Sequence, residues 1–207
     1  MDFSSHNSVA VLAFPPGAGY PRLTTAVLAE LRDLLNEVRL SGLFQGVVIA
    51  ANPRSFATDA SIEEVASVEG IAARDLAQAG QLLFNHIEDF PLPVVAAIRG
   101  YCLGGGLDLA LACQARVATY DASFGHPGAS LGLITGWGGT QRLTRLIGRT
   151  AATQLLLTAE RVPASQALTL GLVDELAPSQ DLVETASRRA LKVGFRIQDS
   201  GFSVLSF

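Results

Sequence analysis

Two stretches of the chain repeat apolar residues at the spacing of an amphipathic helix. From Arg22 to Leu40 apolar residues recur three or four positions apart, and Gly42 follows where a helix C-terminus favours glycine. A second pattern of this kind runs from about Ala72 to Ile87 and is stopped by Pro91 and Pro93. These patterns predict two helices in the first half of the chain.

Short apolar runs between turn residues predict buried strands. Strands that alternate with helices indicate βα units and a largely parallel sheet, so the fold class is α/β. The expected strands cover residues 9–14, 46–51, 94–98 and 117–120.

The rest of the chain gives weaker patterns. Three short helices are expected, separated by Gly148, Pro163 and Gly171. We expect an irregular loop over residues 53–71, and residues 192–207 show neither a clear helical period nor a hairpin. The three short helices would cover residues 139–148, 150–158 and 164–170.

Length and charge narrow the class of protein. The 207 residues are enough for one substantial core, and 49% of them are apolar. A net charge of −4 without a run of Lys or Arg argues against a nucleic-acid partner. Cys102 and Cys113 both lie in apolar stretches, which favours buried free thiols and a reducing compartment. With no signal-peptide pattern and no run long enough to span a bilayer, we expect a cytoplasmic protein without membrane contact.

The segment from Pro93 to Cys113 carries the most informative chemistry. Its strand runs directly into Gly104, Gly105 and Gly106, after which an apolar helix begins. Glycines allow a ligand to approach backbone N–H groups closely, and a helix N-terminus adds N–H donors and a positive dipole end. Asp108 lies in the first turn of this helix. These features suit an oxyanion hole with an adjacent carboxylate, although a tight packing turn would look alike, and the pattern is no phosphate-binding loop.

Several blocks of the sequence together resemble the enoyl-CoA hydratase/isomerase (crotonase) family. The run from Ile98 to Cys113 resembles the family signature, and the run from Phe124 to Leu143 resembles its next block. The loop from Phe56 to Ile62 is similar to the one that carries the family's other oxyanion donor. The resemblance covers roughly residues 9–190 and continues through Leu156–Val162, Ala167 and Gly171–Asp174.

The resemblance implies a fold, an assembly and a substrate. It implies a crotonase-like ββα spiral core over residues 1–190, helices packed around it, and a homotrimer or hexamer. The family continues with further helices, so residues 191–207 are expected to form an atypical tail in their place. The implied substrate is an acyl-CoA thioester, with CoA as part of the substrate, no separate cofactor and no metal.

The resemblance also assigns roles to individual residues. The thioester oxygen would lie between the backbone N–H groups of Ala60 and Gly105, with Asp108 as acid/base, so that an enolate of the thioester is stabilised. The residues expected to contact the substrate are Gly104, Gly106, His126, Gly128, Thr135 and Trp137.

Some positions depart from the family pattern and leave the reaction open. Hydratases of the family hold water with two glutamates, but the first falls at Asp108 and the second at Gly128. The additional aspartate of the dienoyl isomerases falls at Gly136. His126 could supply an acid or base, or serve as a structural donor, and Trp137 could shape the acyl pocket or pack in the core.

Hydration of a 2-enoyl-CoA in fatty-acid metabolism is the default reaction. Isomerisation and decarboxylation are the alternatives within enolate chemistry, and decarboxylation tolerates the loss of the second carboxylate best. A catalytically degenerate homologue that binds acyl-CoA, or a fragment without a function of its own, are the alternatives outside it.

Overall fold

A six-stranded sheet forms the centre of the fold in the computed structural model, which describes residues 1–17, 19–58 and 70–199. The first two strands pair antiparallel, and every later neighbour pairs parallel. The prediction of a largely parallel sheet is therefore confirmed. In their order across the sheet the strands are β1 (Asp2–His6), β2 (Val9–Ala13), β3 (Gly46–Ala50), β4 (Val94–Ile98), β6 (Ala115–Thr119) and β9 (Glu175–Ala177).

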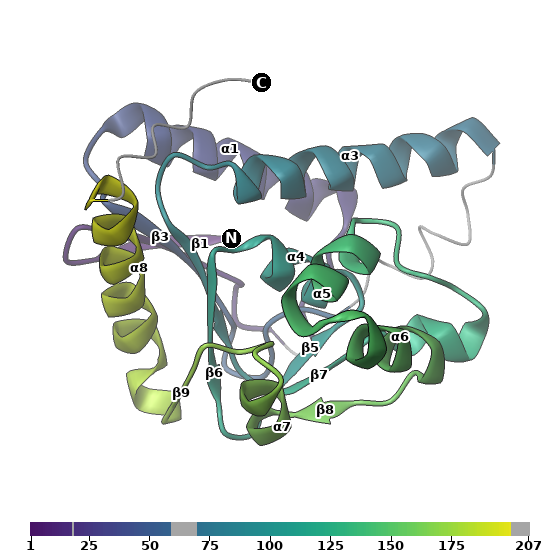
Figure 1. Cartoon of the computed structure of the whole chain (residues 1–207). Coiled ribbons are helices and arrows are strands. Elements are labelled where there is room, and N and C mark those ends of the chain that lie inside the picture. Colours follow the sequence, from purple (N-terminus) through teal and green to yellow (C-terminus); the bar gives the residue numbers. More distant parts are fainter. Residues whose placement is uncertain (18, 59–69, 200–207) are drawn as a thin grey trace.

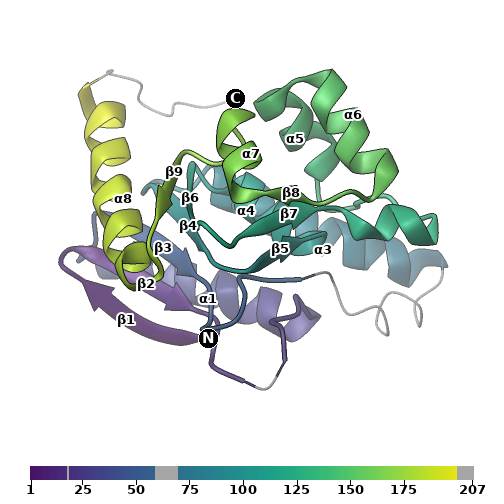
Figure 2. The ribbon, with the colours of Figure 1, turned by 90° about the horizontal axis from the view of Figure 1, so that it is seen from below.

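A second, smaller sheet lies beside the first (Figure 2). Its strands are β5 (Tyr101–Leu103), β7 (Ser123–Gly125) and β8 (Val162–Pro163). The chain visits both sheets in turn, because β4 is followed by β5 and helix α4 (Gly105–Ala112), and β6 is followed by β7 and, after a loop, helix α5 (Gly139–Ile147). This repetition is the ββα spiral of the crotonase fold, as the resemblance implied.

Helices cover both faces of the large sheet (Figure 1). Along β3 the side chains alternate: Val47 and Ile49 join the core that includes α1 (Thr25–Ser41) and α3 (Gly70–Glu88). Val48 and Ala50 face the opposite way, into the cluster that α8 (Leu182–Asp199) completes. Because both faces are covered, the strands read as continuous apolar runs rather than alternating ones.

The predicted helices are confirmed within about three residues. Thr24 caps α1 by accepting a hydrogen bond from the Val27 amide, and Gly42 ends it at a φ of 64°. Gly148 separates α5 from α6 (Arg149–Thr158) at a φ of 81°. Within residues 1–17, 19–58 and 70–199 the remaining helical elements are α7 (Ala164–Thr169) and the short 3₁₀ helices η1 (Pro127–Leu131) and η2 (Ser179–Asp181).

The last helix extends into a segment whose sequence shows neither a clear helical period nor a hairpin. Helix α8 continues through Lys192 to Asp199. Its buried face is made of Leu182, Ala186 and Ala190, one residue per turn. Alanines give a weak periodic signal, yet they let the helix lie close against the sheet. Residues 200–207 lie outside the described part of the chain.

Some strands could not be foreseen from the pattern. β1 is an exposed edge strand with mostly polar side chains, and β5, β7, β8 and β9 have three residues or fewer. Such short strands exist because neighbouring segments pair with them. The expected loop at 53–71 falls mainly on residues 59–69, which the structure does not describe, and α3 already begins at Gly70.

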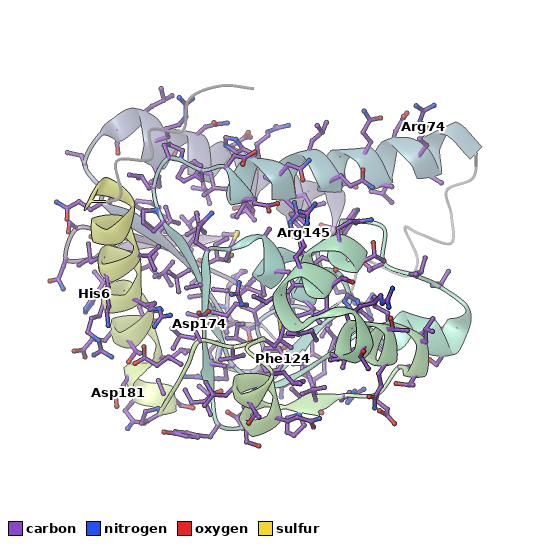
Figure 3. The ribbon with its side chains drawn as sticks, viewed as in Figure 1. His6, Arg74, Phe124, Arg145, Asp174 and Asp181 are labelled. Carbon is purple, nitrogen blue, oxygen red and sulfur yellow. The ribbon has the colours of Figure 1, made fainter. Side chains whose placement is uncertain are left out.

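A buried arginine fixes the end of α4 to the rest of the fold. The Arg116 guanidinium donates to the carbonyl oxygens of Cys113 and Leu172 at 2.8 and 2.9 Å and pairs with Asp174 at 3.1 Å. Asp174, labelled in Figure 3, also pairs with Arg189 of α8 at 3.1 Å. The helix that carries Asp108 is thereby held from its C-terminal end.

Among the helices of the described residues, none is long and apolar enough to cross a membrane.

Candidate active site

The glycine turn between β5 and α4 has a backbone shape that excludes other residues. Gly104 adopts φ 51° and ψ −119°, a conformation that side chains with a Cβ rarely take. Its N–H donates to the Gly125 carbonyl at 2.9 Å, and its carbonyl accepts the Asp108 amide at 3.0 Å. Gly105 then begins α4, whose dipole favours negative charge at this end. The strand–glycine–helix prediction is confirmed.

Gly106 allows the backbone segment around Ala57 to pass close to this turn. A Cβ at Gly106 would lie 2.6 Å from the carbonyl carbon of Ala57 and nearer still to its oxygen. That oxygen accepts the Leu103 amide at 3.1 Å, so the chain before residue 59 runs along β5 toward the helix start. Ala60, the predicted second oxyanion donor, lies outside the described residues.

Asp108 is enclosed in the interior and is contacted from two loops. Its side chain is 1% exposed. Thr135 Oγ1 donates a hydrogen bond to Oδ2, and His126 Nε2 lies 3.7 Å from Oδ1. The structure thus brings together three residues, Asp108, His126 and Thr135, that the sequence had selected separately.

His126 follows β7 and lies two residues after Phe124, which is labelled in Figure 3. Burial lowers the pKa of its imidazole to about 4, so the ring is neutral near pH 7. Only 4% of the residue is exposed, and Nε2 has no hydrogen-bond partner among the described residues.

Gly139 is a site residue that the sequence reasoning missed. A Cβ at this position would clash with Asp108 Oδ1 and would lie 2.9 Å from both Asp108 Cγ and Thr135 Cγ2. The carboxylate therefore has its place only because the first residue of α5 has no side chain. The available signal was the pair of glycines, Gly138 and Gly139, at the start of a predicted helix.

The two glycines at the family's other acid positions have room around them. A Cβ at Gly128, in η1, would meet Leu133 at an ordinary 3.5 Å, and a Cβ at Gly136 would meet Ala77 at 3.9 Å. A Cβ would therefore fit at either position without a clash. Because both residues are glycine, the site lacks the carboxylates that hydratases or dienoyl isomerases have at these positions. Asp108 remains the acidic group of this cluster.

Trp137 is a core residue by its contacts. Its ring is buried and meets Phe84 of α3 edge to face, with ring centroids 5.6 Å apart. A Cβ at Gly80 would lie 2.7 Å from its Cε2, so α3 approaches the indole closely. These contacts match the core-packing alternative for Trp137, and a substrate contact stays a prediction.

The two cysteines are buried free thiols, as predicted. Desolvation, followed by Cys113 and Asp108, raises the pKa of Cys102 well above its ordinary value. Burial raises the pKa of Cys113 to about 12. Neither thiol is therefore a nucleophile at neutral pH. Within the described residues there is also no group of three His, Cys, Asp or Glu side chains arranged to hold a metal ion.

The chain is an α/β protein of the crotonase fold. Its ββα spiral places a helix that begins at a glycine turn next to a buried carboxylate. The sequence profile of the enoyl-CoA hydratase/isomerase family matches residues 5–200. The chain belongs to this family.

Individual relatives agree with this assignment. The fatty acid oxidation complex subunit alpha of Shewanella halifaxensis is 40% identical over 190 residues, which are 89% of this chain but 27% of that protein. The chain thus spans about a quarter of that relative. The enoyl-CoA hydratase of Thermoplasma volcanium superposes with a TM-score of 0.88 at 25% identity, covering 97% of this chain and 84% of that one. For the enoyl-CoA hydratase of Bacillus anthracis the TM-score is 0.84 at 31% identity, with 95% and 76% covered.

Proposed function

We propose that this protein is an acyl-CoA enzyme of fatty-acid metabolism that stabilises the enolate of a thioester. The observation that carries the proposal is the buried Asp108 carboxylate, held by Thr135 within one helical turn of Gly105. A carboxylate next to an N–H-rich helix start suits proton transfer at the carbon beside a polarised carbonyl. The named relatives, a fatty acid oxidation subunit and enoyl-CoA hydratases, support the same class.

In this proposal the thioester oxygen accepts hydrogen bonds from the backbone N–H groups of Gly105 and Ala60. The negative charge that develops on this oxygen is stabilised most in the transition state, where one such donor contributes on the order of 3 kcal/mol. CoA belongs to the substrate, so the proposal requires no further cofactor. Gly104 and Gly106 act by giving the backbone the shape that the ligand requires.

Hydration of a 2-enoyl-CoA is the reaction we propose first. With one carboxylate in the cluster, Asp108 would take a proton from water as the hydroxyl adds to the β-carbon. The electron pair of the double bond would move onto the thioester as an enolate, and Asp108 would return the proton to the α-carbon. Each atom of water is thereby accounted for with a single acid/base group.

Gly128 favours a second candidate, isomerisation or decarboxylation of an acyl-CoA. Isomerisation moves a proton from one carbon to another and needs one carboxylate. Decarboxylation breaks a carbon–carbon bond and leaves the same enolate, which a proton then quenches. Neither reaction needs the carboxylate that Gly128 lacks. A non-catalytic acyl-CoA-binding homologue is the remaining alternative.

Mass spectrometry of an acyl-CoA panel in heavy water tests these reactions together. In heavy water, hydration adds the elements of D₂O, decarboxylation replaces carbon dioxide with a deuteron on the α-carbon, and enolate formation alone exchanges α-protons for deuterium. We expect a mass change that Asp108→Asn abolishes and that Asp121→Asn, at an exposed carboxylate, leaves intact. Binding of acyl-CoA without any mass change across the panel would identify a non-catalytic homologue instead.

We also propose a homotrimer or hexamer in the cytoplasm. Exposed apolar side chains lie at the end of η1 and just after it, at Leu131, Leu133 and Ile134, and on α6 at Leu157. Exposed apolar surface of this kind is typical of an interaction surface. Light scattering should give three or six times the 21.7 kDa chain mass. A monomer across micromolar concentrations would contradict this assembly.

A further inference from the structure

His126 is a buried polar residue that the proposed chemistry does not yet use. Its Nε2 atom is enclosed and has no hydrogen-bond partner among the described residues. Leaving a buried polar atom without a hydrogen bond is unfavourable, so such an atom usually has a partner in the working state of a protein. The carboxylate oxygen that it faces is Asp108 Oδ1, at 3.7 Å.

The geometry gives the two oxygens of Asp108 separate neighbours. Thr135 donates to Oδ2, while His126 faces Oδ1 from the loop after β7. At 3.7 Å the His126 contact is longer than a hydrogen bond. A movement of about 0.8 Å would close it, and catalytic hydrogen bonds are often long in ligand-free structures.

The charge state of the ring also suits donation. Because burial lowers the pKa of His126 to about 4, the imidazole is neutral at neutral pH and carries one N–H. Asp108, from α4, is the acidic group that the described residues place within ion-pair distance of the ring. A neutral donor beside a carboxylate stabilises its charged form without forming an ion pair.

We propose that His126 is a positioning residue for Asp108, donating its Nε2–H to Oδ1 while Thr135 donates to Oδ2. The proposal rests on the role of Asp108 in the proposed function. With a donor at each oxygen, the carboxylate is held in one plane and kept ionised, ready to accept a proton from water or from the substrate. His126 thus supports the Asp108 carboxylate. It does not replace the second carboxylate that is absent at Gly128.

Two substitutions separate hydrogen bonding from packing. His126→Leu fills the space without a donor, whereas His126→Gln keeps an N–H. For His126→Leu we expect kcat to fall roughly tenfold with KM unchanged. The midpoint of the acidic limb of the pH–rate profile should move to a pH about one unit higher. His126→Gln should stay within threefold of the wild type with the limb in place. His86→Leu removes a histidine whose Nε2 is also buried and whose ring meets Phe90 edge to face, and it should change neither kcat nor the pH–rate profile.

Either of two results would overturn the proposal. One is a His126→Leu enzyme with wild-type kcat and an unmoved acidic limb. The other is an equal loss of activity in the Leu and Gln variants together with an equal fall in Tm, since that pattern indicates packing alone.

An NMR measurement tests the same bond without turnover. The chain has three histidines, and ¹⁵N shifts of His126 should show a neutral ring protonated at Nε2, with a resonance that moves in Asp108→Asn. A ring protonated only at Nδ1 would refute the bond. If the wild type converts no acyl-CoA, the proposed function fails, yet this spectrum still decides whether His126 donates to Asp108.

Discussion

Replacing Gly139 with alanine should displace the Asp108 carboxylate and slow the reaction without unfolding the protein. The new Cβ would lie 2.9 Å from Asp108 Cγ and closer to Oδ1. Carbon atoms in contact are ordinarily about 3.5–4.0 Å apart, so Cγ must retreat by at least roughly 0.6 Å and Oδ1 by more. The side chain has little room to do so, because it is buried and held by Thr135.

The expected size of the effect follows from this displacement. A misplacement on the order of 1 Å can cost about 10²-fold in rate, or roughly 2.7 kcal/mol of activation free energy. The backbone itself should tolerate the change, because Gly139 is the first residue of α5 and alanine is a good helix former. We therefore expect kcat to fall about a hundredfold while the Tm changes by only a few degrees.

The assay is the rate of α-proton exchange or turnover on the best acyl-CoA of the panel, measured beside thermal unfolding. Gly136→Ala is the matched control, since its Cβ meets nothing nearer than Ala77 at 3.9 Å, and it should keep wild-type rates. A Gly139→Ala protein within twofold of wild-type kcat would show that Asp108 does not act from the position seen in the structure.

Other perturbations concern stability. Gly106→Ala would drive a Cβ to 2.6 Å from the Ala57 carbonyl carbon and should cost about 2–3 kcal/mol, seen as a Tm lowered by roughly 5–10 °C, whereas Gly128→Ala should melt near the wild type. The pKa of His126 is about 4 in the fold against an ordinary 6.5, so the unfolded chain binds this proton more readily. Up to about 3 kcal/mol of stability should therefore be lost as the pH falls from 6.5 to 4. Denaturant titrations at several pH values should show a smaller loss of unfolding free energy for His126→Gln, and an equal loss in both proteins would contradict the burial of this imidazole. Arg116→Met leaves the charge of Asp174 partly buried and several carbonyls without their donor, so it should lower the unfolding free energy by roughly 3 kcal/mol, and a loss under 1 kcal/mol would argue against this anchor.

The helices and buried strands could be predicted from the sequence because their signals are local. The strand from Val94 to Ile98 is apolar on both faces, and Gly104 to Gly106 mark the later change from β5 to helix α4. The chain itself thus marks where these elements begin and end. The carboxylate at Asp108 could be selected for the same reason. It lies a few residues from the glycines, at a distance that the helix start determines.

Contacts between distant segments were decided by the tertiary structure alone. The clamp on Asp108 joins residues 18 and 27 positions apart, and the space that it occupies depends on a missing Cβ at Gly139, 31 positions away. The short strands and the alanine face of α8 have no strong periodic signal, because each is stabilised by the surface against which it packs. Local propensity and patterning specify where a segment bends or coils, but burial, close approach and the lowered pKa of His126 arise only when segments remote in sequence exclude water together.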